Sequence, residues 1–307
     1  MGNNNHLPEN DGTWPRTAAI VEVGPRDGLQ REEPISTSEK VDLIEQLISA
    51  GLKRIQVTSF VHPKYVPQMA DAEEVCARIP KNDDVVYSGL ALNIRGVERA
   101  LKTGLDQVDI SVSASEPHSR RNANRTSEEA LVEFREMHRL AREAGKIVRG
   151  GIQCAFGYQS AGDVQTEKVV DIARHHLSLG VDELALADSA GFGSPRAIRS
   201  MIMKIKELAG NTPLVLHLHD TRGMGLANVF SAVQAGVGIF DTAFGGLGGC
   251  PFIDGASGNI ATEDTVYMLE EMGIETGVDL RKVAQISQKY EKKLRRPLPG
   301  KAHQLMN

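Results

Sequence analysis

The sequence predicts one (β/α)₈ TIM barrel, an α/β fold, with an additional C-terminal helix. Short apolar or β-branched runs alternate with helical stretches eight times along the chain, and 307 residues is a normal length for one such barrel. Each strand–helix unit implies a parallel strand joined by a crossover helix, and right-handed crossovers close the sheet. A doubly wound open sheet is the structural alternative.

Eight runs are expected to form the strands. They span 18–23, 54–59, 85–92, 107–113, 148–156, 182–188, 213–219 and 239–244. The helical stretches at 36–51 and 126–145 begin with Ser or Thr caps followed by acidic residues, and both end at glycine. Two further helical stretches, about 261–272 and 279–294, follow the eighth strand and supply the extra helix.

Domain boundaries follow from the same pattern. Residues 1–17 are polar and are expected to form a disordered lead-in, because they contain neither the apolar core of a signal peptide nor an Arg-rich presequence. We expect the catalytic barrel over 18–296 and a flexible tail over 297–307.

Charge and cysteine content argue against several classes of protein. The formal net charge is −5 with both signs interspersed, so we expect binding neither to nucleic acid nor to a membrane surface. No apolar run reaches the roughly 20 residues of a transmembrane helix. The cysteines, Cys76, Cys154 and Cys250, are far apart and odd in number, which favours a reducing cytoplasm over a disulfide framework.

Two histidines in the seventh strand are the first candidates for a metal site. His217 and His219, in "VLHLHD", are two residues apart and so point to the same face of the strand, near the barrel end where active sites lie. The alternative is a pair of hydrogen-bonded core histidines. Asp27, after the first strand, and Asn259, beyond the eighth, offer oxygen donors, although Asn259 is also a possible helix cap. Such an oxygen-rich set favours Mg²⁺ or Mn²⁺.

Three further residues at the same barrel end carry chemistry. Arg26 stands beside Asp27 in the turn "EVGPRDGLQ", which could also be a solvated loop. Asp188 closes the sixth strand, and its alternative role is to cap the helix that starts near Ser194. Cys250 lies in "GGLGGCPF", where glycine freedom favours a mobile loop that presents a thiol to a bound substrate.

The segments "EVGPRDGLQ", "SFVHPKYVPQMAD", "HLHDTRGMGLAN" and "GGLGGCPFIDGASGNIATEDTVYMLEEMG" together resemble those of 3-hydroxy-3-methylglutaryl-CoA lyases, which are metal-dependent TIM-barrel enzymes. The similarity runs from about Ala19 to Leu294. The resemblance implies that Asp27, His217, His219 and Asn259 bind a divalent metal. It implies that this ion is Mg²⁺ or Mn²⁺ and that the barrel is a homodimer.

The resemblance also implies catalytic roles for three residues. Arg26 would stabilise the thioester carbonyl as it becomes an enolate, Cys250 would act as a general acid near the nascent acetyl-CoA, and Asp188 would lie near the substrate. The expected reaction cleaves 3-hydroxy-3-methylglutaryl-CoA, or a close 3-hydroxyacyl-CoA, to acetyl-CoA and a 3-oxoacid. For the simplest substrate the 3-oxoacid is acetoacetate.

The sequence departs from the pattern of that family at two places. Gln56, in "QVTSFV", stands where the family's "EATSFV" has glutamate, and "CAFGYQSAG" places Tyr158 and Gln159 where "CALGCPYEG" has cysteine and proline. In the segment after the fourth strand, His118 and Asn124 are expected to contact the substrate carboxylate or the CoA phosphates, unless that segment is only a solvated loop.

These departures keep other functions open. A lyase for citramalyl-CoA or for a longer branched 3-hydroxyglutaryl-CoA is the first alternative. A condensing synthase is disfavoured because such enzymes usually carry a long C-terminal extension and lack the cysteine loop. A non-catalytic barrel that binds metal or acyl-CoA would have no need of the full set formed by Arg26, Cys250 and the metal candidates.

Overall fold

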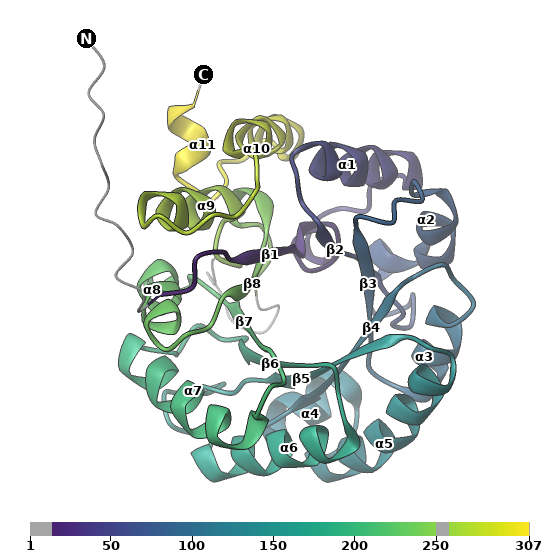
Figure 1. Ribbon diagram of the computed structural model, residues 1–307. Coiled ribbons are helices and arrows are strands. Elements are labelled where there is room, and N and C mark those ends of the chain that lie inside the picture. The colour runs from purple at the N-terminus through teal and green to yellow at the C-terminus, as the bar shows by residue number, and fades with distance from the viewer. Residues whose placement is uncertain (1–13, 250–257, 307) are drawn as a thin grey trace.

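The protein forms a closed barrel of eight parallel strands in the order β1 to β8, with helices around the outside (Figure 1). The structure, a computed structural model, describes residues 14–249 and 258–306. The strands are β1 (Ala19–Glu22), β2 (Arg54–Ser59), β3 (Val86–Ala91), β4 (Gln107–Ser113), β5 (Ile147–Gln153), β6 (Glu183–Asp188), β7 (Leu214–Leu218) and β8 (Ile239–Thr242). Pairing of β8 with β1 closes the ring, so the predicted barrel is confirmed and the open-sheet alternative is wrong.

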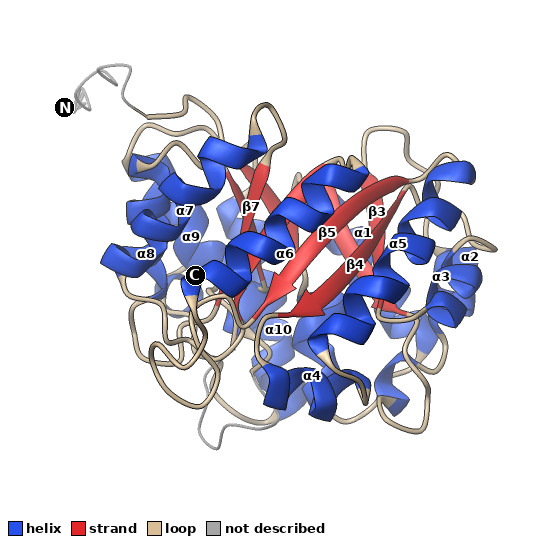
Figure 2. Ribbon diagram, turned by 90° about the horizontal axis from the view of Figure 1, so that it is seen from below, coloured by secondary structure: helices blue, strands red, loops and turns tan. Residues whose placement is uncertain are grey.

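Helices follow the strands and cover the outer face of the barrel (Figure 2). They are α1 (Thr37–Ser49), α2 (Ala72–Arg78), α3 (Ile94–Ala100), α4 (Glu116–Ala123), α5 (Ser127–Glu143), α6 (Thr166–Leu179), α7 (Pro195–Ala209), α8 (Gly225–Gln234), α9 (Thr262–Glu271), α10 (Leu280–Leu294) and α11 (Ala302–Leu305). Ser36 and Thr126 form the expected N-terminal capping boxes of α1 and α5. Helix α10 is the predicted additional C-terminal helix.

The fifth strand is the one whose end differs most from the prediction. Apolar residues continue to Phe156, but β5 ends at Gln153. The reason is local, because Cys154 adopts a left-handed conformation with φ 55°, which breaks the extended backbone. The chain then turns into the loop that carries Tyr158.

The C-terminal segment differs from the flexible tail that the sequence predicts. Leu298 is 2% exposed and packs on Gly245, and His303 of α11 is fully buried. His303 Nδ1 lies 2.8 Å from Glu263 Oε1, and the amide of Gly300 donates to the carbonyl of Gly245 at 3.0 Å. These long-range contacts fix the segment, which is too polar to predict as buried. In the expected lead-in, residues 1–13 lie outside the described residues, and Thr17 bridges to Glu275.

The barrel lumen is polar as well as apolar, which positions the site. Buried charged or amide side chains project from several strands, including Gln56 of β2, Asp109 of β4, Arg149 of β5 and Asp241 of β8. Within the described ranges no helix has the length and hydropathy to span a membrane.

Candidate metal centre and active site

The end of β7 brings two imidazoles together at the mouth of the barrel. His217 Nε2 and His219 Nε2 lie 3.1 Å apart, and the rings are tilted by 51°. His219 Nε2 is 3.8 Å from Asp27 Oδ2, which enters from the short π-helical turn η1 (Gly24–Gly28) after β1. One ligand atom from each of Asp27, His217 and His219 lies within 4.8 Å of the others. This geometry, in which three donors converge, can hold one metal ion.

Asn259 completes the group from the segment after β8. Its amide nitrogen donates to Asp27 Oδ2 at 2.8 Å and to the Leu247 carbonyl at 2.9 Å, while its Oδ1 has no hydrogen-bond partner among the described residues. The helix-cap alternative is wrong, because the N-cap of α9 is Ala261. A buried amide oxygen without a partner among the described residues, on a side chain that contacts a carboxylate, fits a cation better than it fits a packed core.

The protonation states of the group suit a cation. Burial, together with the neighbouring His217, lowers the pKa of His219 to about 3, so its ring is neutral at neutral pH. Burial alone would raise the pKa of Asp27, but the Arg26 guanidinium and both imidazoles hold it well below its ordinary value. A neutral imidazole and an ionised carboxylate are the forms that bind metals.

Asp241 of β8 orients His217, and the sequence analysis missed this role. Asp241 Oδ2 is 3.3 Å from His217 Nδ1, and Arg149 donates to Asp241 Oδ1 at 2.9 Å. Burial opposes ionisation, but Arg149 and His217 lower the pKa of Asp241 to about 2. The carboxylate therefore holds the Nδ1 side of His217 and leaves Nε2 facing His219. A single charge in the apolar run "IFDTAF" was the signal that could have found it.

Arg26 links the candidate ligand Asp27 to Gln56 in the second strand. Its Nη1 pairs with Asp27 Oδ1, and its Nε donates to Gln56 Oε1 of β2. Gln30 also donates to Asp27 Oδ1, at 2.8 Å. The structure therefore brings Arg26 and Gln56 into the same group as the metal candidates. Glu22, in the same sequence turn, instead accepts hydrogen bonds from the backbone amides of Gly24 and Phe244 and from the Thr262 hydroxyl. Its role in the described structure is to hold these segments together.

The glycine loop after β8 passes directly over this group. Gly248 has φ 107°, and a Cβ added there would lie 2.6 Å from Asn259 Nδ2 and 3.2 Å from Asp27 Oδ2. Only glycine fits this close approach without strain. The predicted catalytic residue Cys250, two positions further on, lies outside the described residues.

Asp188 lies at the predicted end of β6 and is fully buried. Its two oxygens accept from the amides of Phe192 at 2.9 Å and Gly193 at 2.8 Å, so it shapes the turn before α7, whose N-cap is Ser194. Burial raises the pKa of Asp188 to about 6, although the two backbone donors oppose the shift. Its backbone pairs with Leu218 of β7, between the two histidines.

The segment after β4 divides into a buried part and an exposed part. His118 is buried, with Nδ1 3.0 Å from Ser113 Oγ, and its ring meets Tyr158 edge to face at 5.1 Å. Burial lowers the pKa of His118 to about 4, so it carries no charge for a phosphate at neutral pH. Asn124 is exposed and ends α4 in a left-handed conformation, φ 53°. Neither residue joins the metal candidates.

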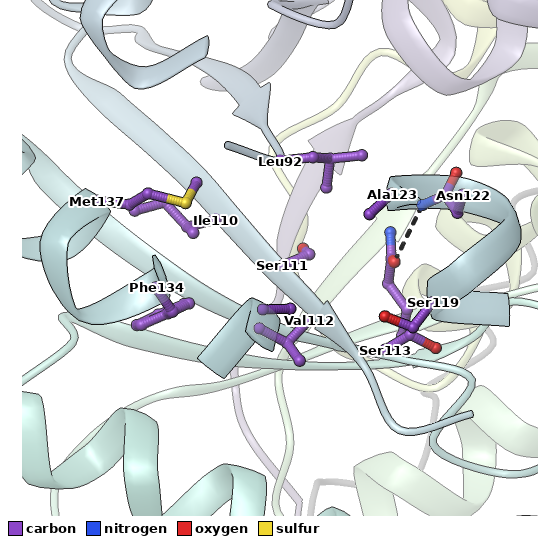
Figure 3. A pocket seen from close by; sticks show the side chains of 12 residues that line it. Leu92, Ile110, Ser111, Val112, Ser113, Ser119, Asn122, Ala123, Phe134 and Met137 are labelled. Atoms are coloured by element: carbon purple, nitrogen blue, oxygen red, sulfur yellow. Dashed lines mark hydrogen bonds between the residues drawn. The ribbon is translucent and has the colours of Figure 1, made fainter. Parts of the chain in front are cut away.

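A small pocket lies between β4 and the helices α4 and α5 (Figure 3). Its lining is mixed: Leu92, Val112, Phe134 and Met137 are apolar, and Asn122 and Gln153 are hydrogen-bonded at 3.4 Å across one side. It contains none of the candidate metal ligands. The pocket is therefore separate from the group of donors at the mouth formed by β1, β7 and β8.

Comparison with known proteins finds similarity along most of the chain. The family model described as HMGL-like matches residues 17–289. A mitochondrial hydroxymethylglutaryl-CoA lyase from Bos taurus is 44% identical over 275 residues, which is 89% of this chain and 85% of that protein.

Solved structures are also similar to this chain over almost its whole length. The crystal structure of the HMG-CoA lyase from Bacillus subtilis superposes with a TM-score of 0.91 at 40% identity, over 95% of this chain and 98% of that one. An HMG-CoA lyase from Acinetobacter baumannii, in complex with coenzyme A and 3-methylmalate, gives 0.90 at 36% identity, over 94% and 95% of the two chains.

Proposed function

The chain belongs to the HMGL-like family and is a carbon–carbon lyase, and we propose that it cleaves 3-hydroxy-3-methylglutaryl-CoA to acetyl-CoA and acetoacetate with a divalent metal ion. The observation that carries the proposal is the group of Asp27, His217 and His219 at the barrel mouth. Asn259 is hydrogen-bonded to Asp27, and its Oδ1 has no partner among the described residues. Relatives at 40–44% identity that are named for this reaction support the substrate.

The reaction places three demands on the site. The tertiary hydroxyl of the substrate loses its proton, and the bond between C2 and C3 breaks. The electron pair of that bond passes into the thioester as an enolate, and C2 then takes up a proton. A bound Mg²⁺ or Mn²⁺, held by Asp27, His217, His219 and Asn259, would supply Lewis-acid polarisation of the hydroxyl oxygen.

Arg26 answers the demand for positive charge. Its guanidinium, anchored by Asp27 and Gln56, faces the mouth of a buried site, where a fixed cation stabilises a developing enolate oxygen strongly. Because Asp27 and Gln56 occupy Nη1 and Nε, the guanidinium is already oriented before the charge develops.

Asp188 and Cys250 are the two residues proposed for proton transfer, one from the hydroxyl and the other to C2. Asp188, whose pKa burial raises to about 6, is suited to accept the hydroxyl proton near neutral pH. The Cys250 thiol would donate the proton to C2, since it follows a loop that passes against Asp27 and Asn259 at Gly248. Closure of that loop would also exclude water from the enolate.

A coupled assay of acetyl-CoA release, with Mg²⁺ and a thiol reductant, tests the proposal. The substrates are 3-hydroxy-3-methylglutaryl-CoA and citramalyl-CoA, offered side by side. The variants are His217→Ala and Cys250→Ala. Cys76→Ala is the matched control, because that thiol is buried in α2, away from the site. The proposal predicts that the native protein and Cys76→Ala turn over 3-hydroxy-3-methylglutaryl-CoA, and that His217→Ala and Cys250→Ala do not.

Turnover of citramalyl-CoA alone would replace the substrate but keep the reaction class. Two observations favour testing it: Gln56 is neutral where the family pattern has a charge, and Tyr158, whose ring packs edge to face on His118, lies in the other segment that departs from that pattern. No acetyl-CoA from either substrate would contradict both assignments. The predicted homodimer and the cytoplasmic location remain predictions.

A further inference from the structure

Gln56 links two charged side chains inside the barrel. Arg26 Nε donates to Gln56 Oε1, and Gln56 Nε2 donates to Asp109 Oδ2 of β4. All three residues are nearly inaccessible, with exposed fractions of 8%, 2% and 3% for Arg26, Gln56 and Asp109. The three side chains form a continuous hydrogen-bonded path from β4 to the arginine at the barrel mouth.

Asp109 fixes which end of the Gln56 amide faces Arg26. A carboxylate only accepts hydrogen bonds, whereas an amide has one donor end and one acceptor end. With its nitrogen held by Asp109, Gln56 must present its carbonyl oxygen to Arg26. In the reversed orientation, the amide nitrogen would face the guanidinium, donor against donor, and both buried groups would lose a partner.

Asp109 is itself held independently of Gln56. Ser88 of β3 donates to Asp109 Oδ2 at 2.9 Å, and Gln107 donates to Oδ1 at 2.6 Å. Arg149 Nε lies 3.7 Å from Oδ1 and balances the buried charge. The carboxylate is therefore a fixed point from which the amide and then the arginine take their orientation.

We propose that Asp109 is a positioning residue that orients Arg26 through Gln56, and that the pair Gln56 and Asp109 replaces a single glutamate on β2. This inference rests on the proposed function, because it assigns Arg26 to the enolate. A glutamate at position 56 would pair with Arg26 directly, but it would also place its carboxylate against that of Asp109. The neutral amide at 56 and the charge on β4 are thus two parts of one arrangement.

A double-mutant cycle tests the exchange. Asp109→Asn removes the fixed acceptor, and Gln56→Glu sets two carboxylates against each other, so each single variant should lower kcat about 10-fold with little change in KM. The double variant Gln56→Glu/Asp109→Asn restores one acceptor facing Arg26 and one donor facing position 56. Its kcat should return to within about threefold of the native value.

Two further measurements separate positioning from packing. Ser88→Ala removes a neutral hydrogen bond to the same Asp109 oxygen but keeps the charge and the Gln56 contact, so its loss should be smaller than that of Asp109→Asn. In ¹⁵N-arginine-labelled protein, the Arg26 Nε–H resonance, assigned with Arg26→Lys, should shift in each single variant and return in the double variant. Thermal unfolding of every variant verifies that the barrel is folded.

The outcomes are distinct. Losses that multiply in the double variant, or an Arg26 resonance that does not respond to position 109, would overturn the proposal. If the native protein released no acetyl-CoA from 3-hydroxy-3-methylglutaryl-CoA, the proposed function would fail, while the resonance would still decide whether Asp109 orients Arg26.

Discussion

Two groups of histidines lie on opposite sides of the barrel wall, one on β7 and the other on the outer helices. His217 and His219 belong to β7 and meet at the barrel mouth, where Asp27 and Asp241 face them. Asp241 holds the Nδ1 side of one ring, and Asn259 donates to Asp27 through Nδ2 while its Oδ1 has no hydrogen-bond partner among the described residues. The donor atoms of this group converge on a shared point.

The second group, His138, His175 and His176, lies on α5 and α6 outside the barrel. His176 stacks on Phe134, with ring centroids 3.8 Å apart, and its Nε2 lies 3.3 Å from the Gly151 carbonyl. Burial lowers the pKa of His176 to about 3. Within the described part of the chain, this group makes no three-residue metal cluster. A buried ring with a lowered pKa thus occurs in both groups, His219 in the first and His176 in the second, and the converging carboxylates distinguish the site.

The largest effect is expected from removing one member of the β7 pair. His217→Ala leaves two of the three converging donors and removes the imidazole that Asp241 contacts. We therefore expect the rate of acetyl-CoA release to fall by at least about 100-fold. His176→Gln is the matched control and should retain more than about half of the native rate. An equal loss in both variants would remove the distinction between the groups.

A smaller effect is expected from Asp241→Asn, which keeps the shape but removes the charge behind His217. Affinity for Mn²⁺, measured by calorimetry, should fall about 10- to 100-fold, because an oriented carboxylate raises the basicity of the ligand. Unchanged affinity would mean that Asp241 serves only the pairing with Arg149.

His176→Gln sharpens the comparison from the other side. Loss of the stacking on Phe134 should lower the free energy of unfolding by about 1 kcal/mol, while metal affinity stays unchanged. Urea denaturation and the same calorimetric titration measure the two quantities. A loss of metal affinity without a loss of stability would reverse the assignment of the two groups.

The pH dependence of that core histidine is a further test of its burial. His176 keeps its ring neutral down to about pH 3 in the folded chain, whereas the unfolded chain binds the proton below its ordinary pKa of 6.5. Stability should therefore fall as pH decreases from 6.5 towards 3. Between pH 6 and pH 5 the His176 contribution is about 1 kcal/mol. The difference between native protein and His176→Gln should show this slope, and a slope of opposite sign would contradict the burial argument.

The sequence predicted the fold and the converging ligands because both depend on local pattern. Strand periodicity places His217 and His219 on one face, and barrel closure brings Asp27 next to them. The roles of Asp241 and Asp109 depend instead on the register between strands, such as the one that places His217 opposite Asp241. A single charged residue within an apolar strand indicates a buried polar role, but the sequence does not show which residue it contacts.

Position 303 shows a second limit. The buried ring of His303 lies 2.8 Å from Glu263 Oε1 and 3.4 Å from Glu291 Oε1. These partners belong to α9 and α10, and the polar segment around His303 has no periodicity that would predict its burial. Tyr158 is similar, since its ring packs on His118 through tertiary contact alone. Where a side chain is placed by distant partners, sequence pattern predicted a loop or a tail.

Mn²⁺ binding followed by electron paramagnetic resonance tests the central claim most directly. The native chain, stripped of metal and titrated with Mn²⁺, should bind one ion, which His217→Ala loses and His176→Gln retains. Addition of 3-hydroxy-3-methylglutaryl-CoA should change the Mn²⁺ spectrum of the native chain. Binding that survives in His217→Ala, or that disappears in His176→Gln, would contradict the assignment of the barrel mouth as the metal centre.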